Sequence, residues 1–141
     1  MTSESCRHNG AVRILVADGR PDVRSALRLL LEQDTGMVVS AEARKGDDVV
    51  AQVRVTCPDV IILDCDLPGL PVRDLLLAVR SICPRVWVVA LCSRAEGRWA
   101  AMSAGADVFV SKADYPQRLL NIVRQGCRGR ASEEPGKPNG H

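Results

Sequence analysis

Histidine is nearly absent from this chain of 141 residues, and its scarcity excludes several kinds of active site. The two histidines, His8 and His141, lie near the two ends, outside every segment with regular hydrophobic spacing. A catalytic triad or a zinc site built on histidine therefore has no base or ligand to use. The glycine-rich motifs G-x-G-x-x-G and G-x-x-x-x-G-K-[ST] are also missing, which argues against the familiar nucleotide-binding loops.

Long apolar runs are missing as well. No stretch approaches the roughly 18 apolar residues that a membrane-spanning helix needs, and residues 1–11 are too polar for a signal peptide. The 19 basic residues are spread along the chain and balanced by 17 acidic ones, so no basic stripe for nucleic acid is expected. We therefore predict a single soluble, cytoplasmic globular domain without membrane contact.

The cysteines, tryptophans and helical charges are expected to play structural roles. The six cysteines form no C-x-x-C pair and most lie inside apolar segments, so we prefer reduced, half-buried thiols over a disulfide framework. Cys65 is expected to fill the core, with a redox role as the alternative. Trp87 and Trp99 are expected to pack inside, with exposure of Trp99 for a partner as the alternative. Most of the acidic and basic residues of the predicted helices are expected to face solvent.

Short apolar segments alternate with longer segments of helical hydrophobic period. Five strands are predicted, at residues 12–17, 37–41, 60–63, 86–91 and 108–110. Five helices are predicted, at residues 21–32, 47–56, 72–82, 96–104 and 116–125. Strict alternation predicts an α/β fold with a parallel sheet covered by helices on both faces. The flavodoxin-like strand order 2-1-3-4-5 is among the few that right-handed crossovers allow, and it is the order that we predict.

Both ends of the chain are predicted to lie outside the folded domain. Residues 1–11 are polar and are expected to form a disordered head, whereas the domain itself spans residues 12–126. Residues 127–141 are rich in glycine, proline and charge, so we expect a disordered tail or linker stump. This composition favours a domain cut from a longer protein over a natural single-domain protein.

Polar side chains end or follow four of the predicted strands. The first strand ends in Asp18, the third in Asp64 and the fourth in Cys92 and Ser93, and Lys112 follows the fifth. Because the carboxyl ends of parallel strands meet at one edge of the sheet, these side chains are expected at one site. Neighbouring carboxylates repel each other unless a cation lies between them, so the set predicts Mg²⁺ with oxygen ligands. A lysine there would hold a phosphoryl group, with Asp64 as its nucleophile.

Four stretches of the sequence resemble the receiver domain of bacterial two-component response regulators. They are ILVAD at 14–18, PDVIILDCDLPG at 58–69, AGAD at 104–107 and KAD at 112–114. The segments VRSAL at 23–27 and VVSAE at 38–42 are most similar to the NarL branch, whose members carry a LuxR-type helix-turn-helix. The resemblance extends over most of the predicted domain.

The resemblance implies roles for individual residues. Asp64 lies at the phosphoacceptor position of the family, Asp18 at the first residue of its acidic pair, and Lys112 at its lysine after the fifth strand. Phe109 lies at the aromatic switch position. The backbone carbonyl of Asp66 lies at a metal-ligand position, so the implied Mg²⁺ is bound by Asp18, Asp64 and Asp66.

Gly19 is a departure from the family pattern, which usually has a second acid at this position. A direct metal ligand is therefore missing, and weak binding of Mg²⁺ is expected. The carboxylate of Asp66 is either a partial substitute for that ligand or a solvated side chain.

The fourth predicted strand holds a second departure. The family's threonine or serine that donates a hydrogen bond to the phosphoryl group falls on Cys92 when counted from Asp64, and on Ala90 when counted back from Lys112. We prefer Cys92, with Ser93 beside it. Cysteine is a poor hydrogen-bond donor and alanine is none. Ser93 also begins a capping-box pattern for the following helix.

The resemblance implies a signalling domain rather than an enzyme. A sensor histidine kinase would phosphorylate Asp64, and the added charge would move Cys92 or Ser93 and Phe109. This movement would change the surface of the last two predicted helices and the strand between them, controlling homodimerisation or a transcriptional output domain. DNA would be reached only through that domain, which lies outside this chain. The alternatives are a phosphorylation-independent receiver for dimerisation or ligand binding, and a nucleotide-binding enzyme, which has the right sheet but no phosphate-binding loop.

Overall fold

The computed structural model describes residues 10–114 and 116–132, in which strands and helices alternate throughout. The strands are β1 (Val12–Ala17), β2 (Met37–Ala43), β3 (Val60–Asp64), β4 (Trp87–Cys92) and β5 (Val108–Ser111). The helices are α1 (Pro21–Leu31), α2 (Gly46–Thr56), α3 (Val72–Ile82), α4 (Ala95–Ser103) and α5 (Gln117–Ser132). The predicted α/β class is confirmed. Within the described part of the chain, no helix is both long and apolar enough to cross a membrane.

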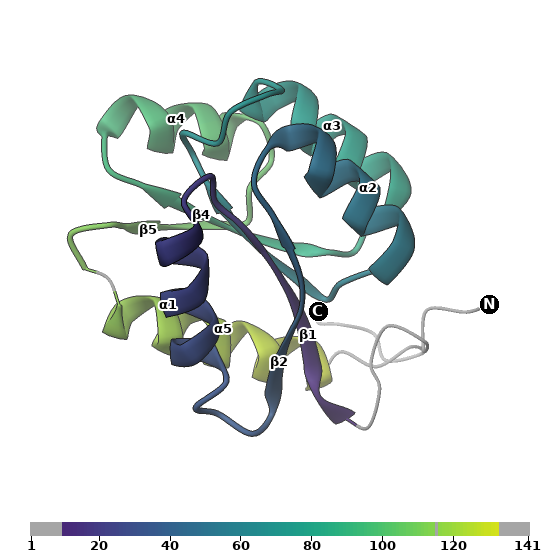
Figure 1. Ribbon diagram of the computed structural model, residues 1–141, viewed down its shortest axis with the longest axis vertical. Helices are drawn as coiled ribbons and strands as arrows, with labels where there is room; N and C mark the ends of the chain where they lie inside the picture. Colours follow the sequence, from purple (N-terminus) through teal and green to yellow (C-terminus); the bar gives the residue numbers. More distant parts are fainter. Residues whose placement is uncertain (1–9, 115, 133–141) are drawn as a thin grey trace.

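The five strands are parallel and lie in the order β2-β1-β3-β4-β5 (Figure 1), which confirms the predicted order. After β1 the chain adds β2 on one side and then crosses to β3 on the other side. The direction of winding therefore reverses between β1 and β3. In open parallel sheets, ligands bind at the carboxyl ends of the strands beside such a reversal.

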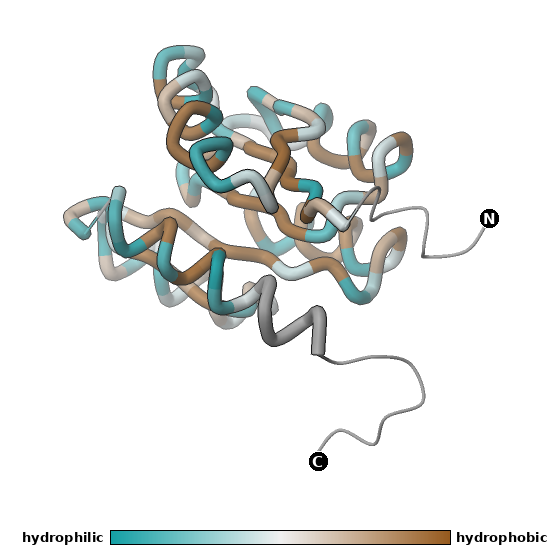
Figure 2. The backbone as a smooth tube through the Cα atoms, turned by 90° about the horizontal axis from the view of Figure 1, so that it is seen from below, coloured by the Kyte–Doolittle hydropathy of each residue, from teal (hydrophilic) through white to brown (hydrophobic). Residues whose placement is uncertain are grey.

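The sheet is buried between two layers of helices. Helices α2, α3 and α4 cover one face, and α1 and α5 cover the other (Figure 1). Because side chains alternate along a strand, neighbouring residues of β3 enter different cores: Ile61 packs with the first layer and Ile62 with the second. This double burial explains why the strands are continuous apolar runs, which pass through the middle of the molecule in Figure 2.

Arg24 and Arg28 fasten α1 to the edge strand β2. Arg24 Nε lies 3.0 Å and Arg28 Nη2 2.9 Å from the two carboxylate oxygens of Glu42. Burial raises the pKa of Glu42, but hydrogen bonds from Arg28 and Arg24 outweigh it and hold that pKa below its ordinary value. Arg24 is an exception to the expectation that the helical charges mostly face solvent, because its side chain is only 17% exposed and contacts Glu42 of β2.

Arg80 joins the last turn of α3 to the edge of the sheet where β4 and β5 begin. Its Nη2 donates hydrogen bonds to the carbonyl of Gly105 and to the carboxylate of Asp107, each at 2.8 Å. Its Nη1 donates to the carbonyl of Val86. The same carboxylate oxygen of Asp107 accepts the N–H of Val88 at 2.7 Å. One side chain therefore links α3 with the starts of both strands.

The last helix is longer than predicted. Helix α5 continues to Ser132, so residues 127–132 are helical and the prediction of a disordered tail is wrong for them. Gly126 lies inside the helix because the ring of Trp87 occupies the space that a Cβ at this position would need. The glycine therefore serves packing and does not end the helix. The predictions for residues 1–9 and 133–141 fall outside the described residues.

Candidate functional site

The carboxyl ends of β1 and β3 bring Asp18 and Asp64 together. The strands are neighbours, with Ala17 paired to Leu63, and each aspartate is the next residue after this pair. Asp18 is 2% exposed and Asp64 is 8% exposed. Among the described residues, these are the two charged side chains that are buried. The structure thus places two acids at the reversal of the winding direction.

Lys112 reaches this site from the loop after β5. Its Nζ lies 2.8 Å from Oδ1 of Asp64, where the lysine side chain is 36% exposed and the aspartate side chain 10%. The backbone N–H of Lys112 donates to the carbonyl of Cys92 at 3.0 Å, which holds the loop against the end of β4. Oδ1 of Asp64 also accepts the N–H of Asp66 at 3.2 Å. One charged donor and one backbone donor therefore orient the Asp64 carboxylate.

Asp18 is held by the start of α1. Its Oδ1 accepts the backbone N–H of Arg20 at 2.9 Å, and its carbonyl accepts Nη1 of Arg24 at 2.8 Å. Burial raises the pKa of the Asp18 carboxyl against the hydrogen bond from Arg20, and the Asp64 carboxylate adds to this rise. Arg24 was missed by sequence reasoning because no motif marks it. Only its position in the first turns of the helix after Asp18 could have suggested this contact.

The raised pKa of Asp18 predicts that this residue destabilises the folded chain at neutral pH. Because the folded chain binds the Asp18 proton more tightly than the unfolded chain does, the penalty is absent well below pH 3.8 and grows as the pH rises through the raised folded pKa. Asp18→Asn keeps an oxygen for the N–H of Arg20. At pH 7 without Mg²⁺ it should increase the free energy of unfolding by about 1 kcal/mol, the usual scale of a single-residue effect.

Denaturant unfolding at pH 7 and pH 3 measures this difference, and the gain should shrink at the lower pH. Asp66→Asn is the matched control, because this neighbouring carboxylate is exposed and surface changes usually stay within about 0.5 kcal/mol. An Asp18→Asn chain that is equally destabilised at both pH values would show that the carboxylate is needed for packing and that its charge carries no penalty.

The donor set suits a hard divalent cation such as Mg²⁺. Proteins commonly bind Mg²⁺ through one or two carboxylates, with water and phosphate oxygens completing the coordination. Asp18 and Asp64 supply two such carboxylates. Burial is the main cause of the raised pKa of Asp18 and the Asp64 carboxylate adds to it, and a cation between the two acids would oppose both effects. The side chain of Asp66 is exposed. Within residues 10–114 and 116–132, no three acidic, histidine or cysteine side chains gather as a metal-ligand cluster.

A disulfide joins Cys65 and Cys92 beside the acidic pair. The expectation of reduced thiols is wrong for these two cysteines. Their Cα atoms lie 5.3 Å apart because β3 and β4 are neighbours that end together, and this distance suits a disulfide. Cys57 is disulfide-bonded as well, whereas Cys83 is free. Spacing along the sequence missed the Cys65–Cys92 pair because its members are 27 residues apart.

The structure places Cys92, and not Ala90, at the end of β4. Ala90 lies two residues earlier inside the strand and is fully buried. In the disulfide, Cys92 has no S–H group and cannot donate a hydrogen bond. Ser93, the nearest hydroxyl in sequence, is exposed. The predicted capping box is wrong, because α4 begins one residue later than that pattern requires, with Arg94 at its N-cap and no side-chain cap.

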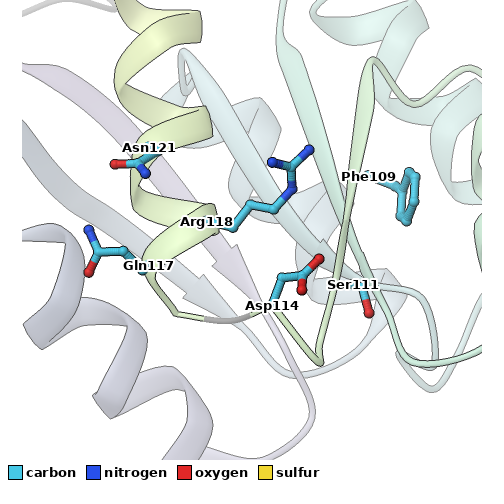
Figure 3. Close-up of a pocket in the computed structure, with 6 residues that line it drawn as sticks. All are labelled: Phe109, Ser111, Asp114, Gln117, Arg118 and Asn121. Atoms are coloured by element: carbon cyan, nitrogen blue, oxygen red, sulfur yellow. The ribbon is translucent and has the colours of Figure 1, made fainter.

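Phe109 contacts α4 from β5. The guanidinium carbon of Arg98 lies 4.1 Å from the centroid of the Phe109 ring, a cation–π contact. A hollow of about 510 Å³ lies between β5 and α5, and it is lined by Phe109, Ser111, Asp114, Gln117, Arg118 and Asn121 (Figure 3). Figure 3 shows the Arg118 side chain extending from α5 toward β5. Neither Asp18 nor Asp64 lines this hollow, so it is separate from the acidic site.

A five-stranded parallel sheet that carries two buried aspartates and a lysine at its carboxyl edge defines the class of phosphoryl-accepting receiver domains. The family model of the response regulator receiver domain matches residues 14–124, and the chain belongs to this family. It is a receiver domain of two-component phosphorelay signalling. The comparisons lend no support to the phosphorylation-independent alternative.

Relatives confirm the predicted NarL and LuxR-type branch. The chain is 31% identical over 122 residues to the transcriptional regulatory protein YxjL of Bacillus subtilis, and the alignment covers 85% of this chain and 56% of YxjL. It is 30% identical over 119 residues to the nitrate/nitrite response regulator NarP of Escherichia coli, and this alignment covers 83% of the chain and 55% of NarP. The chain thus spans about half the length of these curated relatives.

A solved structure with a similar fold belongs to the same branch. The LuxR-family two-component response regulator from Aurantimonas sp. SI85-9A1 superposes with a TM-score of 0.77 at 26% identity. The superposition covers 84% of this chain and 86% of that chain.

Proposed function

We propose that Asp64 accepts a phosphoryl group from the phosphohistidine of a sensor histidine kinase. The observation that supports this role most directly is the 2.8 Å contact between Nζ of Lys112 and Oδ1 of this buried carboxylate. A carboxylate oxygen of Asp64 forms the new bond to phosphorus while the P–N bond of the phosphohistidine breaks, and the imidazole keeps that electron pair and takes up a proton. Lys112 is placed to neutralise charge on the transferred group.

Asp18 and Asp64 would hold Mg²⁺, together with the backbone carbonyl of Asp66. When bound, the ion supplies positive charge that stabilises the phosphoryl oxygens during transfer. With Gly19 in place of a further acid, we propose that Mg²⁺ binds weakly until the phosphoryl group adds its own oxygens. Asp64 itself becomes phosphorylated in the transfer. We therefore propose that the chain is a phosphoryl acceptor rather than an enzyme that converts a separate substrate.

We propose that the charge gained at Asp64 changes the surface formed by α4, β5 and α5. Two contacts support this route: the N–H of Lys112 joins the carbonyl of Cys92, and Phe109 of β5 packs against Arg98 of α4. The output would be homodimerisation through this surface, or control of a DNA-binding domain outside this chain. The greater length of the relatives supports such a domain. We propose a cytoplasmic location, where a kinase and DNA are both accessible.

Intact-mass measurement after incubation with Mg²⁺ and acetyl phosphate, in reducing buffer, tests the proposal. The chain should gain one phosphoryl group, Asp64→Asn should gain none, and Asp74→Asn should behave like the unmodified sequence. Asp74 is a suitable control because it is an exposed aspartate of α3 outside the site. A phosphoryl group that persists in Asp64→Asn would place the acceptor elsewhere, and no gain in any chain would remove the proposed function.

A further inference from the structure

We infer that Cys65 and Cys92 are a redox-sensitive pair that controls phosphoryl transfer to Asp64. The inference rests on the acceptor role proposed above for Asp64. Cys65 directly follows the acceptor in the chain, and Cys92 ends the neighbouring strand. The disulfide between them therefore links the acceptor segment to the strand end that is proposed to move.

One cysteine of this pair is more open to solvent than the other. Cys92 is 3% exposed, whereas Cys65 is half-buried. A Cβ built on Gly97 of α4 would lie 3.3 Å from the Cβ of Cys65 and 3.9 Å from that of Cys92. Helix α4 therefore packs directly on the pair at a position that has no side chain. Formation or reduction of the disulfide therefore alters the packing surface beneath α4, a helix of the proposed output surface.

Thiol–disulfide exchange with a low-molecular-weight disulfide provides a balanced route to the bond. The thiolate of Cys65, the more exposed of the two, attacks one sulfur of the reagent, breaks its S–S bond and releases one thiol. The thiolate of Cys92 then attacks the Cys65 sulfur of this mixed disulfide and releases the second thiol. The protein pair loses two electrons and two protons, which the reagent gains, and a dithiol reductant reverses both steps.

The oxidised pair opposes phosphorylation for two reasons. The bond ties the end of β4 to the end of β3, so Cys92 and Ser93 cannot approach a phosphoryl group on Asp64 without moving both strands. It also removes the S–H group through which Cys92 would donate a hydrogen bond to that group. Reduction restores both the freedom and the donor. Coupling between two sites in one protein is typically about 5- to 150-fold, and we expect about tenfold here.

The full chain is compared after treatment with oxidised glutathione and after treatment with a dithiol, each followed by removal of the reagent. Both samples then receive Mg²⁺ and acetyl phosphate, and intact mass is followed over time. The reduced chain should gain its phosphoryl group about tenfold faster than the oxidised chain, in line with typical site coupling. Cys65→Ser, which cannot form the bond, should take up the phosphoryl group equally fast after either treatment. Cys83→Ser, the matched control with the pair intact, should keep the difference.

Peptide mapping of the oxidised chain identifies the bond without any phosphorylation. Trypsin leaves Cys57 and Cys65 on one peptide, so an Asp-specific protease is added to separate them by cleavage at Asp59 and Asp64. A cross-link between the peptides of Cys65 and Cys92, lost in the reduced chain, is expected.

Three results would overturn the inference. The first is an absent Cys65–Cys92 cross-link after oxidation. The second is equal phosphorylation of the oxidised and reduced chains, which would leave the acceptor role of Asp64 intact. The third is failure of both chains to gain a phosphoryl group while the cross-link forms and breaks normally. This last result removes the proposed function of Asp64 and, with it, the control by the cysteines.

Discussion

Lys112→Met is expected to lower the rate of phosphoryl uptake by Asp64 about 100-fold, the usual cost of removing one donor that faces developing charge. The lysine Nζ is 2.8 Å from the acceptor carboxylate and is the charged group that contacts it in the described structure. Methionine fills a similar volume without charge, so the change isolates electrostatics from packing. It also removes a cation that lowers the pKa of Asp18, so that pKa should rise further.

Time-resolved intact-mass measurement with acetyl phosphate and Mg²⁺, in reducing buffer, gives the rate for this variant. Lys45→Met is the matched control, because Lys45 is an exposed lysine before α2 that is outside the ion pair with Asp64. A Lys112→Met chain that reacts at the same rate as Lys45→Met would show that the ion pair has no part in the transfer.

Gly19→Asp is expected to tighten the binding of Mg²⁺ by about 10- to 100-fold, since losing even an indirect partner of a metal ligand commonly costs that much. The new carboxylate follows Asp18 directly and restores the acid that the family usually carries here. Space for it requires a small shift, because a Cβ on Gly19 lies 3.3 Å from Cδ of Pro68. Without metal, a third carboxylate near Asp18 and Asp64 should lower the free energy of unfolding.

Calorimetric titration with Mg²⁺ measures the affinity, and denaturant unfolding with and without Mg²⁺ measures the stability. Gly36→Asp adds the same charge before β2, at the opposite edge of the sheet, and should leave the affinity unchanged. An unchanged affinity in Gly19→Asp would mean that this loop position does not face the cation, and that weak binding has another cause.

Much of the fold could be predicted because the sheet is parallel and buried on both faces. The run at residues 60–63 is apolar without alternation, as expected for a strand between two helical layers, and its flanking helices show the 3.6-residue period. The end of α5 could not be predicted in this way. Glycine often ends a helix, so Gly126 suggests an end at this point of the sequence. Only the structure shows why a glycine lies inside α5: the ring of Trp87, 39 residues earlier in the chain, occupies the space of a side chain.

The acidic site was also predictable only in part. Asp18 and Lys112 directly follow strands and Asp64 ends one, so topology alone brings them to one edge of the sheet. The partnership of Cys65 and Cys92 depends on the distance between two strand ends and on the direction of two side chains, which spacing along the sequence does not give. Counting along the sequence does not separate Cys92 from Ala90, whereas the bounds of β4 place Cys92 at the end of the strand and Ala90 inside it.

The hydrogen bonds of Arg80 hold the starts of β4 and β5 in place. Arg80 ties α3 to Gly105 and to Asp107, which in turn accepts the N–H of Val88. Cys92 ends β4 and is tied by the disulfide to Cys65, and Asp64 ends the neighbouring strand β3. In the oxidised chain β4 is therefore held at both ends, by Arg80 at its start and by the disulfide at Cys92. Reduction would release only the carboxyl end of β4, next to α4, while the start of the strand stays fixed.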